Sequence, residues 1–374
     1  MENKWRFLKE KSAPYLLLTP FVIWFLIFFG YAFIRVLFFS FTDYDLFATP
    51  RFVGLSNFQG LFREFLFARA LKNSLTYAII VTTFQTIGAL ILAVVLNYKI
   101  RGIKFFRAAY YMPSVTSSVV ITLIFIWLFQ RKGVINYLLT LFAQYRLLIW
   151  VFLIFFLISQ TLLVLKEKWR QRPVSIFEPS YVVLSLLLAV VITFLLKTGG
   201  FISILTVQPL ETIWLNTRET TPNWAGSLAF PRPLAAIMFL NIWTTIPTFM
   251  LLYLAGLQDI PLSLYQAAEV DGASTVQKFW YVTVPQLRHI TFLVVTMGLI
   301  STLQMFDQVA IIGGQAPQES IITLAYYVYV TMFPRSAIAE VGMASAAALV
   351  LAVLTLIIVV IQQRVTGERR YKSE

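Results

Sequence analysis

The sequence predicts an all-α protein that crosses a lipid bilayer about eight times. Hydrophobic residues make up 59% of the chain, charged residues make up only 13%, and the mean hydropathy is +0.78. A soluble domain is much richer in charge than this. Apolar runs that can cross the hydrocarbon core, roughly 20 residues each, recur along the chain. They lie at Tyr15–Phe39, Leu75–Asn97, Tyr110–Phe129, Leu147–Leu165, Pro179–Leu196, Leu234–Leu257, Ile290–Ile312 and Val341–Ile361.

The first apolar run is predicted to be a retained transmembrane helix. It follows the basic residues Lys4, Arg6, Lys9 and Lys11, as a signal peptide core would. It is too long for such a core, however, and no small-residue cleavage site follows it.

The excess of basic residues follows the predicted membrane topology. The chain has 30 Lys and Arg against 17 Asp and Glu. With the N-terminus in the cytoplasm, most of the basic residues fall in the inner segments: the N-terminal arm, Lys99–Arg107, Lys166–Arg172, Gln258–Arg288 and the C-terminal tail. This distribution is the positive-inside pattern. It predicts that both termini are cytoplasmic and that the chain does not bind nucleic acid. The absence of cysteine excludes disulfides, thiol catalysis and Cys-ligated metals.

The fourth and fifth runs are predicted to form a membrane hairpin. The short basic segment Lys166–Pro173 joins them and is expected on the cytoplasmic side. Neither run carries a convincing polar face, so packing or partner contact is the expected role. The following segment, Lys197–Pro233, is predicted to be an outer interfacial loop.

Polar residues gather in the sixth and seventh runs. Polar groups at membrane depth are costly, so they normally face the bundle interior or a water-filled path. Asn241 and Gln304 are the stronger candidates for lining a path, although hydrogen bonding between helices would explain them equally well. Pro247 can kink the sixth helix beside them.

A polar interruption, Tyr265–His289, separates the sixth and seventh runs. Ala267 and Ala268 precede a turn centred on Gly272, so the first half is predicted to be a short helix that ends at a glycine. The second half, which contains Phe279 and Pro285, is predicted to form another short element before the chain becomes apolar again. Small residues allow another surface to approach the backbone closely, which suits a docking element better than a catalytic one.

Motifs for catalysis or nucleotide binding are absent from the sequence. There is no Gly-rich phosphate loop ending in Gly-Lys-Ser/Thr, and the single histidine, His289, cannot form a zinc-binding pair. Carboxylates within the apolar runs are nearly missing, which argues against a proton-driven transporter.

The interruption resembles the EAA loop of the membrane-spanning subunits of bacterial ABC importers. That pattern runs Glu-Ala-Ala, then Asp-Gly-Ala three residues on, then Phe and Leu-Pro. Gln266 stands where the family usually has Glu, and His289 stands where it usually has proline. The matching residues are Ala267, Ala268, Asp271, Gly272, Ala273, Phe279 and Pro285.

Further matches narrow the resemblance to carbohydrate-uptake permeases, the group that includes the maltose and glycerol-phosphate importers. The matches cover nearly the whole chain except about Ala143–Glu211, and the outer Gly-Gly-Gly-Pro motif is degraded to Gly313–Pro317. The matching segments are Ser40–Tyr44, Val53–Leu55 with Asn57-Phe58, Phe106-Arg107 with Pro113, Ala255–Leu257 with Ile260-Pro261, and Phe306-Asp307.

The resemblance implies a type I ABC importer permease in a bacterial inner membrane. The single permease domain, 1–374, would have a six-helix core, an inserted hairpin at 144–211 and a cytoplasmic coupling loop at 258–289. The coupling loop would rock the helices when a pair of ATPase subunits closes. Its expected contact residues are Gln266, Ala267, Ala268, Glu269, Asp271, Gly272, Ala273, Phe279 and Pro285.

The resemblance also implies the partners. They are two cytoplasmic ATPase subunits that bind ATP and Mg²⁺, a second homologous permease, an extracytoplasmic solute-binding protein, a sugar substrate and the lipid bilayer. This chain would itself hold no metal or cofactor. By likeness to the maltose permease, the substrate path would include Asn241, Thr244, Thr245, Thr248, Gln304 and Met305.

Three alternatives remain open at this point. The substrate could be glycerol phosphate or another polyol derivative, although no Lys or Arg lies mid-span in the sixth or seventh run. A polytopic membrane enzyme would need clustered acids, histidines or a metal site. A scaffold role would explain the hairpin but not the coupling loop.

Overall fold

The computed structural model describes residues 15–97, 102–170, 179–222, 226, 229–334 and 337–366. The basic N-terminal arm, Lys99, Arg101, Gln171–Pro173 and the tail residues 367–374 lie outside the described residues. The chain divides into two compact units, 1–125 with 215–374 and 126–214. The predicted hairpin insertion, 144–211, falls within the second unit, and its separation from a six-helix core stays a prediction.

The predicted all-α fold class is confirmed. Among the described residues, seven helices are long and apolar enough to cross a membrane, and an eighth span is possible where α5 and α6 form a bent pair. The strands described are two short antiparallel pairs: β1 (Thr42–Asp43) with β2 (Arg51–Phe52), and β3 (Thr220–Thr221) with β4 (Phe230–Pro231).

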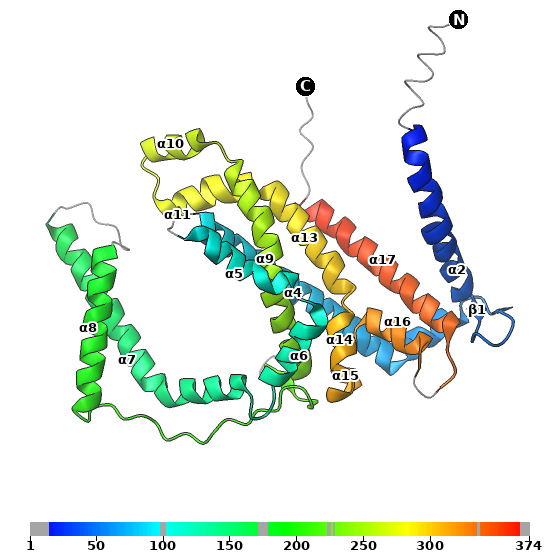
Figure 1. Cartoon of the computed structure of the whole chain (residues 1–374), viewed down its shortest axis with the longest axis horizontal. Helices are drawn as coiled ribbons and strands as arrows, with labels where there is room; N and C mark the ends of the chain where they lie inside the picture. The colour runs from blue at the N-terminus through cyan, green and yellow to red at the C-terminus, as the bar shows by residue number, and fades with distance from the viewer. Residues whose placement is uncertain are drawn as a thin grey trace, which may run out of the picture. The chain divides into compact units, whose positions relative to one another are not determined.

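The first unit contains the helices that carry the candidate site (Figure 1). After the helix Tyr15–Ser40, which includes η1 (Leu26–Gly30) and α2 (Tyr31–Ser40), come α3 (Ser56–Arg63), α4 (Phe65–Asn97), α5 (Ile103–Val115) and the start of α6 (Ser118–Leu128). The chain returns with α9 (Arg232–Gln258), α10 (Leu262–Val270), α11 (Thr275–Lys278), η3 (Phe279–Thr283), α12 (Val284–Gln286) and α13 (Arg288–Leu303). It ends with α14 (Asp307–Ile312), η4 (Gly313–Gln315), α15 (Gln318–Ile321), α16 (Leu324–Met332) and α17 (Val341–Thr366).

The second unit is built on a helical hairpin of α7 (Val134–Trp169) and α8 (Pro179–Thr198), which pack against each other. The buried Ser185 hydroxyl donates to Gln160 Oε1 across the pair at 2.7 Å. Asn136 ties the following loop to α7, because its Nδ2 donates to the Thr212 carbonyl at 2.8 Å and its Oδ1 accepts from Trp214 at 2.9 Å. The helix α7 begins at Val134, 13 residues before the predicted start of the fourth apolar run at Leu147.

The third predicted span, Tyr110–Phe129, is not one straight helix. Helix α5 ends at Val115, α6 begins at Ser118, and the two helices meet at 94°. The hydroxyls of Ser114 and Thr116 donate to carbonyls of the preceding turn, at 2.8 and 3.0 Å. Such side chains compete with the helical backbone pattern, and Thr116 adopts an extended conformation. The run of hydroxyl residues therefore breaks the span.

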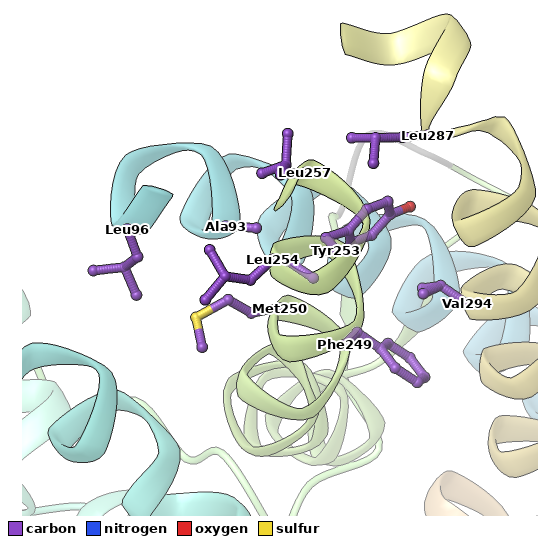
Figure 2. Close-up of a cluster of buried hydrophobic side chains, with 10 residues drawn as sticks. Ala93, Leu96, Phe249, Met250, Tyr253, Leu254, Leu257, Leu287 and Val294 are labelled. Atoms are coloured by element: carbon purple, nitrogen blue, oxygen red, sulfur yellow. The ribbon is translucent and has the colours of Figure 1, made fainter. Parts of the chain in front are cut away.

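Helix α4 packs along both α9 and α13, and these contacts form the centre of the first unit. Ala89 and Ala93 are fully buried and allow α9 to approach α4 closely. The buried cluster around them continues into α9 and reaches Leu287 and Val294 on the α13 side (Figure 2). Helix α17 packs against α13, α16 and α2.

The start of α17 is fixed against β1 at a glycine. The Nδ2 of Asn57 donates to the carbonyls of Ser40 and Thr42, at 2.9 Å each. A Cβ at Gly342 would collide with the Thr42 carbonyl oxygen and would lie 2.9 Å from Asn57 Nδ2. The contact therefore requires glycine at position 342.

We predict that Gly342→Ala destabilises the protein by about 1–3 kcal/mol, because the added methyl group must displace backbone. The measurement is SDS-titrated unfolding of the purified chain in mild detergent. Gly314→Ala is the matched control, since a Cβ there meets nothing within 4 Å. Equal unfolding midpoints for the two variants would contradict the assignment of this contact.

Candidate functional site

The coupling loop predicted at 258–289 folds as two short helices joined by a tight glycine turn. Gly272 has φ +75°, the left-handed region that closes a helix. Its N–H donates to the Glu269 carbonyl at 3.0 Å, and the N–H of Ala273 donates to the Ala268 carbonyl at 2.9 Å. This pair of hydrogen bonds is a Schellman motif. The backbone carbonyls of Ala268 and Glu269 at the end of α10 therefore have hydrogen-bond partners within the loop itself.

The second helix of the loop starts at once, with Ser274 as its N-cap. The Gln277 N–H donates to Ser274 Oγ at 3.3 Å, and the Ser274 N–H donates to Gln277 Oε1 at 2.8 Å. This reciprocal capping box fixes where α11 begins. The angle between the two helices is therefore set by residues 272–274.

Two side-chain contacts link the halves of the loop. Lys278 Nζ lies 3.1 Å from Glu269 Oε1, and the hydroxyls of Tyr265 and Thr283 are 2.9 Å apart. The ion pair is largely exposed on the glutamate side, so it contributes little to stability but orients Glu269. With Gln266 uncharged, Asp271 and the paired Glu269 are the acidic side chains near the turn.

The surface of the loop that faces away from α4 and α9 carries exposed apolar side chains. Val270 is 89% exposed and Tyr281 is 79% exposed, although both lie outside the transmembrane helices. Leu262, Val276 and Trp280 are also exposed. Among the predicted contact residues, Gln266, Ala267, Glu269, Asp271, Gly272 and Pro285 are exposed, and Ala268, Ala273 and Phe279 are half-buried.

The inner side of the loop rests on α4 and α9. Phe279, Tyr265 and Lys278 line a cavity of about 230 Å³ together with Asn97 of α4 and Leu257 of α9. Leu257 also belongs to the buried cluster that joins α4, α9 and α13. The loop therefore lies against the same helices that form the buried cluster.

A second cavity, of about 340 Å³, lies beside α9 in the first unit. Its described lining has no charged side chain. Four predicted path residues, Asn241, Thr244, Thr245 and Thr248, come together here. The other lining residues are Pro113, Ser114, Thr116, Ser118, Ile121, Leu240, Phe249, Met297, Ser301 and Gln308.

The polar side chains of α9 are ordered within this cavity. The Thr245 hydroxyl donates to Asn241 Oδ1 at 3.3 Å, and the Thr244 hydroxyl donates to the Leu240 carbonyl at 3.1 Å. Asn241, Thr244 and Thr245 are half-buried, and Thr248 is exposed. The cavity therefore offers hydroxyl and carboxamide groups on one helix face.

The other two predicted path residues do not line the cavity. Gln304 is exposed at the end of α13, and Met305 is buried with its carbonyl accepting from the Thr323 hydroxyl at 2.8 Å. The helix is interrupted at Gln304–Phe306, between the end of α13 and the start of α14. The interruption changes which residues face the cavity, and Gln308 lines it instead. A sequence pattern that assumes an unbroken helix could not have placed Gln308 at the cavity. The hydroxyl-rich segment 114–118, in contrast, can be recognised in the sequence.

Comparison with known proteins identifies the fold and the kind of protein. No family model matches the chain. It is 26% identical to "Probable ABC transporter permease protein YurN" of Bacillus subtilis, covering 95% of this chain and 96% of the relative. It is 28% identical to "Arabinooligosaccharides transport system permease protein AraP" of Bacillus subtilis, covering 100% and 94%. It is 26% identical to "Multiple sugar-binding transport system permease protein MsmF" of Streptococcus mutans, covering 92% of each.

A solved structure shares the fold over the full length. It is a chain of a bacterial ABC transporter involved in the import of the acidic polysaccharide alginate, with a TM-score of 0.64 and 21% identity over 99% of this chain and 100% of that chain. The chain is an ABC importer permease. Its resemblance to the carbohydrate-uptake permeases is thereby confirmed. As a permease it is a multi-pass membrane protein whose role is transport rather than catalysis.

We predict that Gly272→Ala loosens the coupling loop of the permease. A Cβ there meets nothing within 4 Å, so the cost arises from the left-handed backbone, about 1–2 kcal/mol. Amide exchange in 262–286 should rise roughly ten-fold, as measured by hydrogen–deuterium exchange. Gly30→Ala is the control, because Gly30 has helical φ −61°. Unchanged exchange in the Gly272 variant would contradict a left-handed backbone at this position.

Proposed function

We propose that this permease forms half of the translocation path of an ATP-driven, binding-protein-dependent importer for sugars. The observation that carries the proposal is the arrangement within the first unit. An exposed apolar loop is connected through a packed cluster to an uncharged polar cavity. The names of the relatives, which include transport systems for arabinooligosaccharides and multiple sugars, favour a di- or oligosaccharide substrate.

The coupling loop is the element through which ATP hydrolysis would act. Val270, Val276 and Tyr281 offer an apolar surface that a cleft in a cytoplasmic ATPase subunit would cover. ATP and Mg²⁺ would be bound by a pair of such subunits, since the sequence has no phosphate-binding loop. Closure of the pair would move the loop as a rigid body and carry α9 and α13 with it.

The remaining partners complete the path. A second permease would supply its other half, and an extracytoplasmic binding protein would deliver the solute. One solved relative is an alginate importer in complex with a sugar-bound periplasmic protein, which supports this expectation. The positive-inside pattern favours cytoplasmic termini in a bacterial inner membrane.

The cavity beside α9 favours a neutral, hydroxyl-rich solute. Asn241, Thr245 and Gln308 can donate to and accept from hydroxyl groups. A glycerol-phosphate substrate is the second candidate, but it would need a basic partner, and the described lining provides none. Among the described residues there is also no group of three metal-ligating side chains that would favour a membrane enzyme.

We predict that Thr245→Val lowers sugar uptake roughly ten-fold, because one hydrogen bond to the solute is lost in a low-dielectric cavity. The complex, co-expressed with its genomic neighbours, is reconstituted in liposomes. Radiolabelled maltotriose and arabinotriose uptake is measured alongside ATP hydrolysis. ATP hydrolysis stimulated by loaded binding protein should persist, since the coupling loop is untouched.

Thr83→Val is the matched control. Thr83 is exposed on α4, and its hydroxyl donates to the Ile79 carbonyl of its own helix at 2.7 Å. Uptake by this variant should equal that of wild type. If Thr245→Val transports every neutral sugar at the wild-type rate, the cavity is not the solute path. If the complex never couples sugar to ATP hydrolysis, the importer function itself is wrong.

A further inference from the structure

Helix α4 is longer than a membrane crossing requires. Its 33 residues correspond to roughly 50 Å of helix, whereas the hydrocarbon core is about 30 Å thick. It packs against α15 and α16 near its start and reaches the coupling loop with Asn97 at its end (Figure 1). The apolar run within it begins at Leu75. The first turns of α4, residues 65–74, are therefore expected at headgroup depth, on the side of the membrane away from the coupling loop.

Two buried polar side chains fix how this end of α4 is turned. The Nδ2 of Asn73 donates to the Ile322 carbonyl at 3.0 Å, and the Leu324 N–H donates to Ser74 Oγ at 2.8 Å. Both contacts join α4 to the segment between α15 and α16. They set the rotation of α4 about its own axis at this end, and so they also determine which of its side chains face outward.

An aromatic ring and two cations lie on the outward face of these turns. Phe65, Arg69 and Lys72 are spaced by four and three residues, so they share one side of the helix. All three are exposed. The Arg69 guanidinium lies over the Phe65 ring, 5.0 Å from its centroid, which restrains the cation beside the ring. Exposed rings of this kind settle at the headgroup level of a bilayer, and this contact therefore holds Arg69 at phosphate depth.

The charge of this stretch is positive although it lies on the outer side of the predicted topology. Residues 63–72 contain three basic side chains and one carboxylate, and Arg63 is exposed in the last turn of α3. The carboxylate, Glu64, is half-buried and accepts a hydrogen bond from the Tyr327 hydroxyl of α16. Basic residues are disfavoured on the outer side of a membrane. Their presence on this exposed face therefore favours a specific anionic partner.

Farther along α4, the same face is apolar and exposed. One leaflet of the hydrocarbon core is about 15 Å deep, which roughly ten residues of helix cover. Within that distance Ile79 is 65% exposed on this face, and Phe84 is 59% exposed at its edge. Thr83 lies between them, but its hydroxyl donates to the Ile79 carbonyl of its own helix at 2.7 Å. A molecule with a negative head and an apolar tail fits both parts of this face.

We propose that this face of α4 binds one anionic phospholipid of the outer leaflet. Arg69 and Lys72 hold the phosphate, since a guanidinium fork and an ammonium group are suited to phosphate oxygens. One acyl chain lies along Ile79 and Phe84. A net negative headgroup gains more from two cations than a zwitterionic headgroup does. The inference goes beyond sugar import and does not depend on the solute, although the choice of leaflet follows from the topology proposed above.

The test is native mass spectrometry of the full-length chain, alone and in its importer assembly. Each sample is titrated with phosphatidylglycerol or phosphatidylcholine that carry identical acyl chains. Wild type should bind phosphatidylglycerol at least about ten-fold more tightly than phosphatidylcholine. The double variant Arg69→Gln, Lys72→Gln should lower the phosphatidylglycerol affinity to that of phosphatidylcholine and leave the phosphatidylcholine affinity unchanged. Misfolding would weaken binding of both lipids.

Two control variants isolate the site. Arg69→Lys combined with Lys72→Arg keeps both charges and should retain the preference for phosphatidylglycerol. Arg51→Gln combined with Lys132→Gln removes the same total charge from exposed positions outside α4. This second control should bind phosphatidylglycerol as tightly as wild type does, because it leaves the α4 face intact.

Three results would overturn the proposal. Equal affinity of wild type for the two lipids would show that the face does not select a negative headgroup. An equal loss in the two double-glutamine variants would show that net charge, rather than this site, sets the preference. If the chain alone is selective and the importer assembly is not, a partner subunit covers the face and no lipid binds there in the importer.

A fourth result would assign the cations to another class of partner. If Arg69→Gln with Lys72→Gln weakens capture of sugar-free binding protein but leaves the lipid preference unchanged, the cations form a protein-docking surface and the lipid site is wrong.

Discussion

The close packing of α4 against α9 and α13 is the constraint on which the rest of the first unit depends. Ala89 and Ala93 bring the helices together, and Phe249 and Leu257 extend the same cluster toward its two ends. Phe249 lines the cavity beside α9, and Leu257 lies beneath the coupling loop. In a membrane, tight packing rather than water exclusion holds helices together. Because packed interiors transmit strain, the proposed function requires this cluster to connect the loop with the cavity.

The coupling loop and the cavities have opposite surface characters for a physical reason. The loop satisfies its own backbone through the Gly272 turn and the Ser274 cap, and it leaves apolar side chains exposed. The cavity beside α9 instead gathers hydroxyl and amide groups where lipid cannot solvate them. One end of the cluster is therefore suited to protein docking and the other to a polar cargo.

Much of the architecture could be predicted from the sequence, because apolar runs of spanning length determine helices wherever lipid is the solvent. The Gly272 turn was also predictable, since Ala-Ala followed by Asp-Gly-Ala indicates a helix end. The sequence did not predict the 94° break at Thr116 or the end of α13 at Leu303. Both depend on side-chain hydrogen bonds and tertiary contacts that hydropathy does not contain. The cavity beside α9 differs from the predicted path because of these breaks: Gln304 and Met305 lie away from it, whereas Gln308 and Ser114 line it.

An ATPase subunit that covers the exposed face of the coupling loop would shield side chains such as Val270 from solvent. Because the chain has no cysteine, Val270→Cys introduces a single thiol on that face. The most direct measurement is its rate of maleimide labelling in the permease assembly with and without the ATPase subunits, with Phe47→Cys as the exposed control outside the loop. We expect the ATPase to slow labelling at position 270 at least about ten-fold and to leave labelling at position 47 unchanged. Equal labelling at position 270 in both assemblies would contradict it.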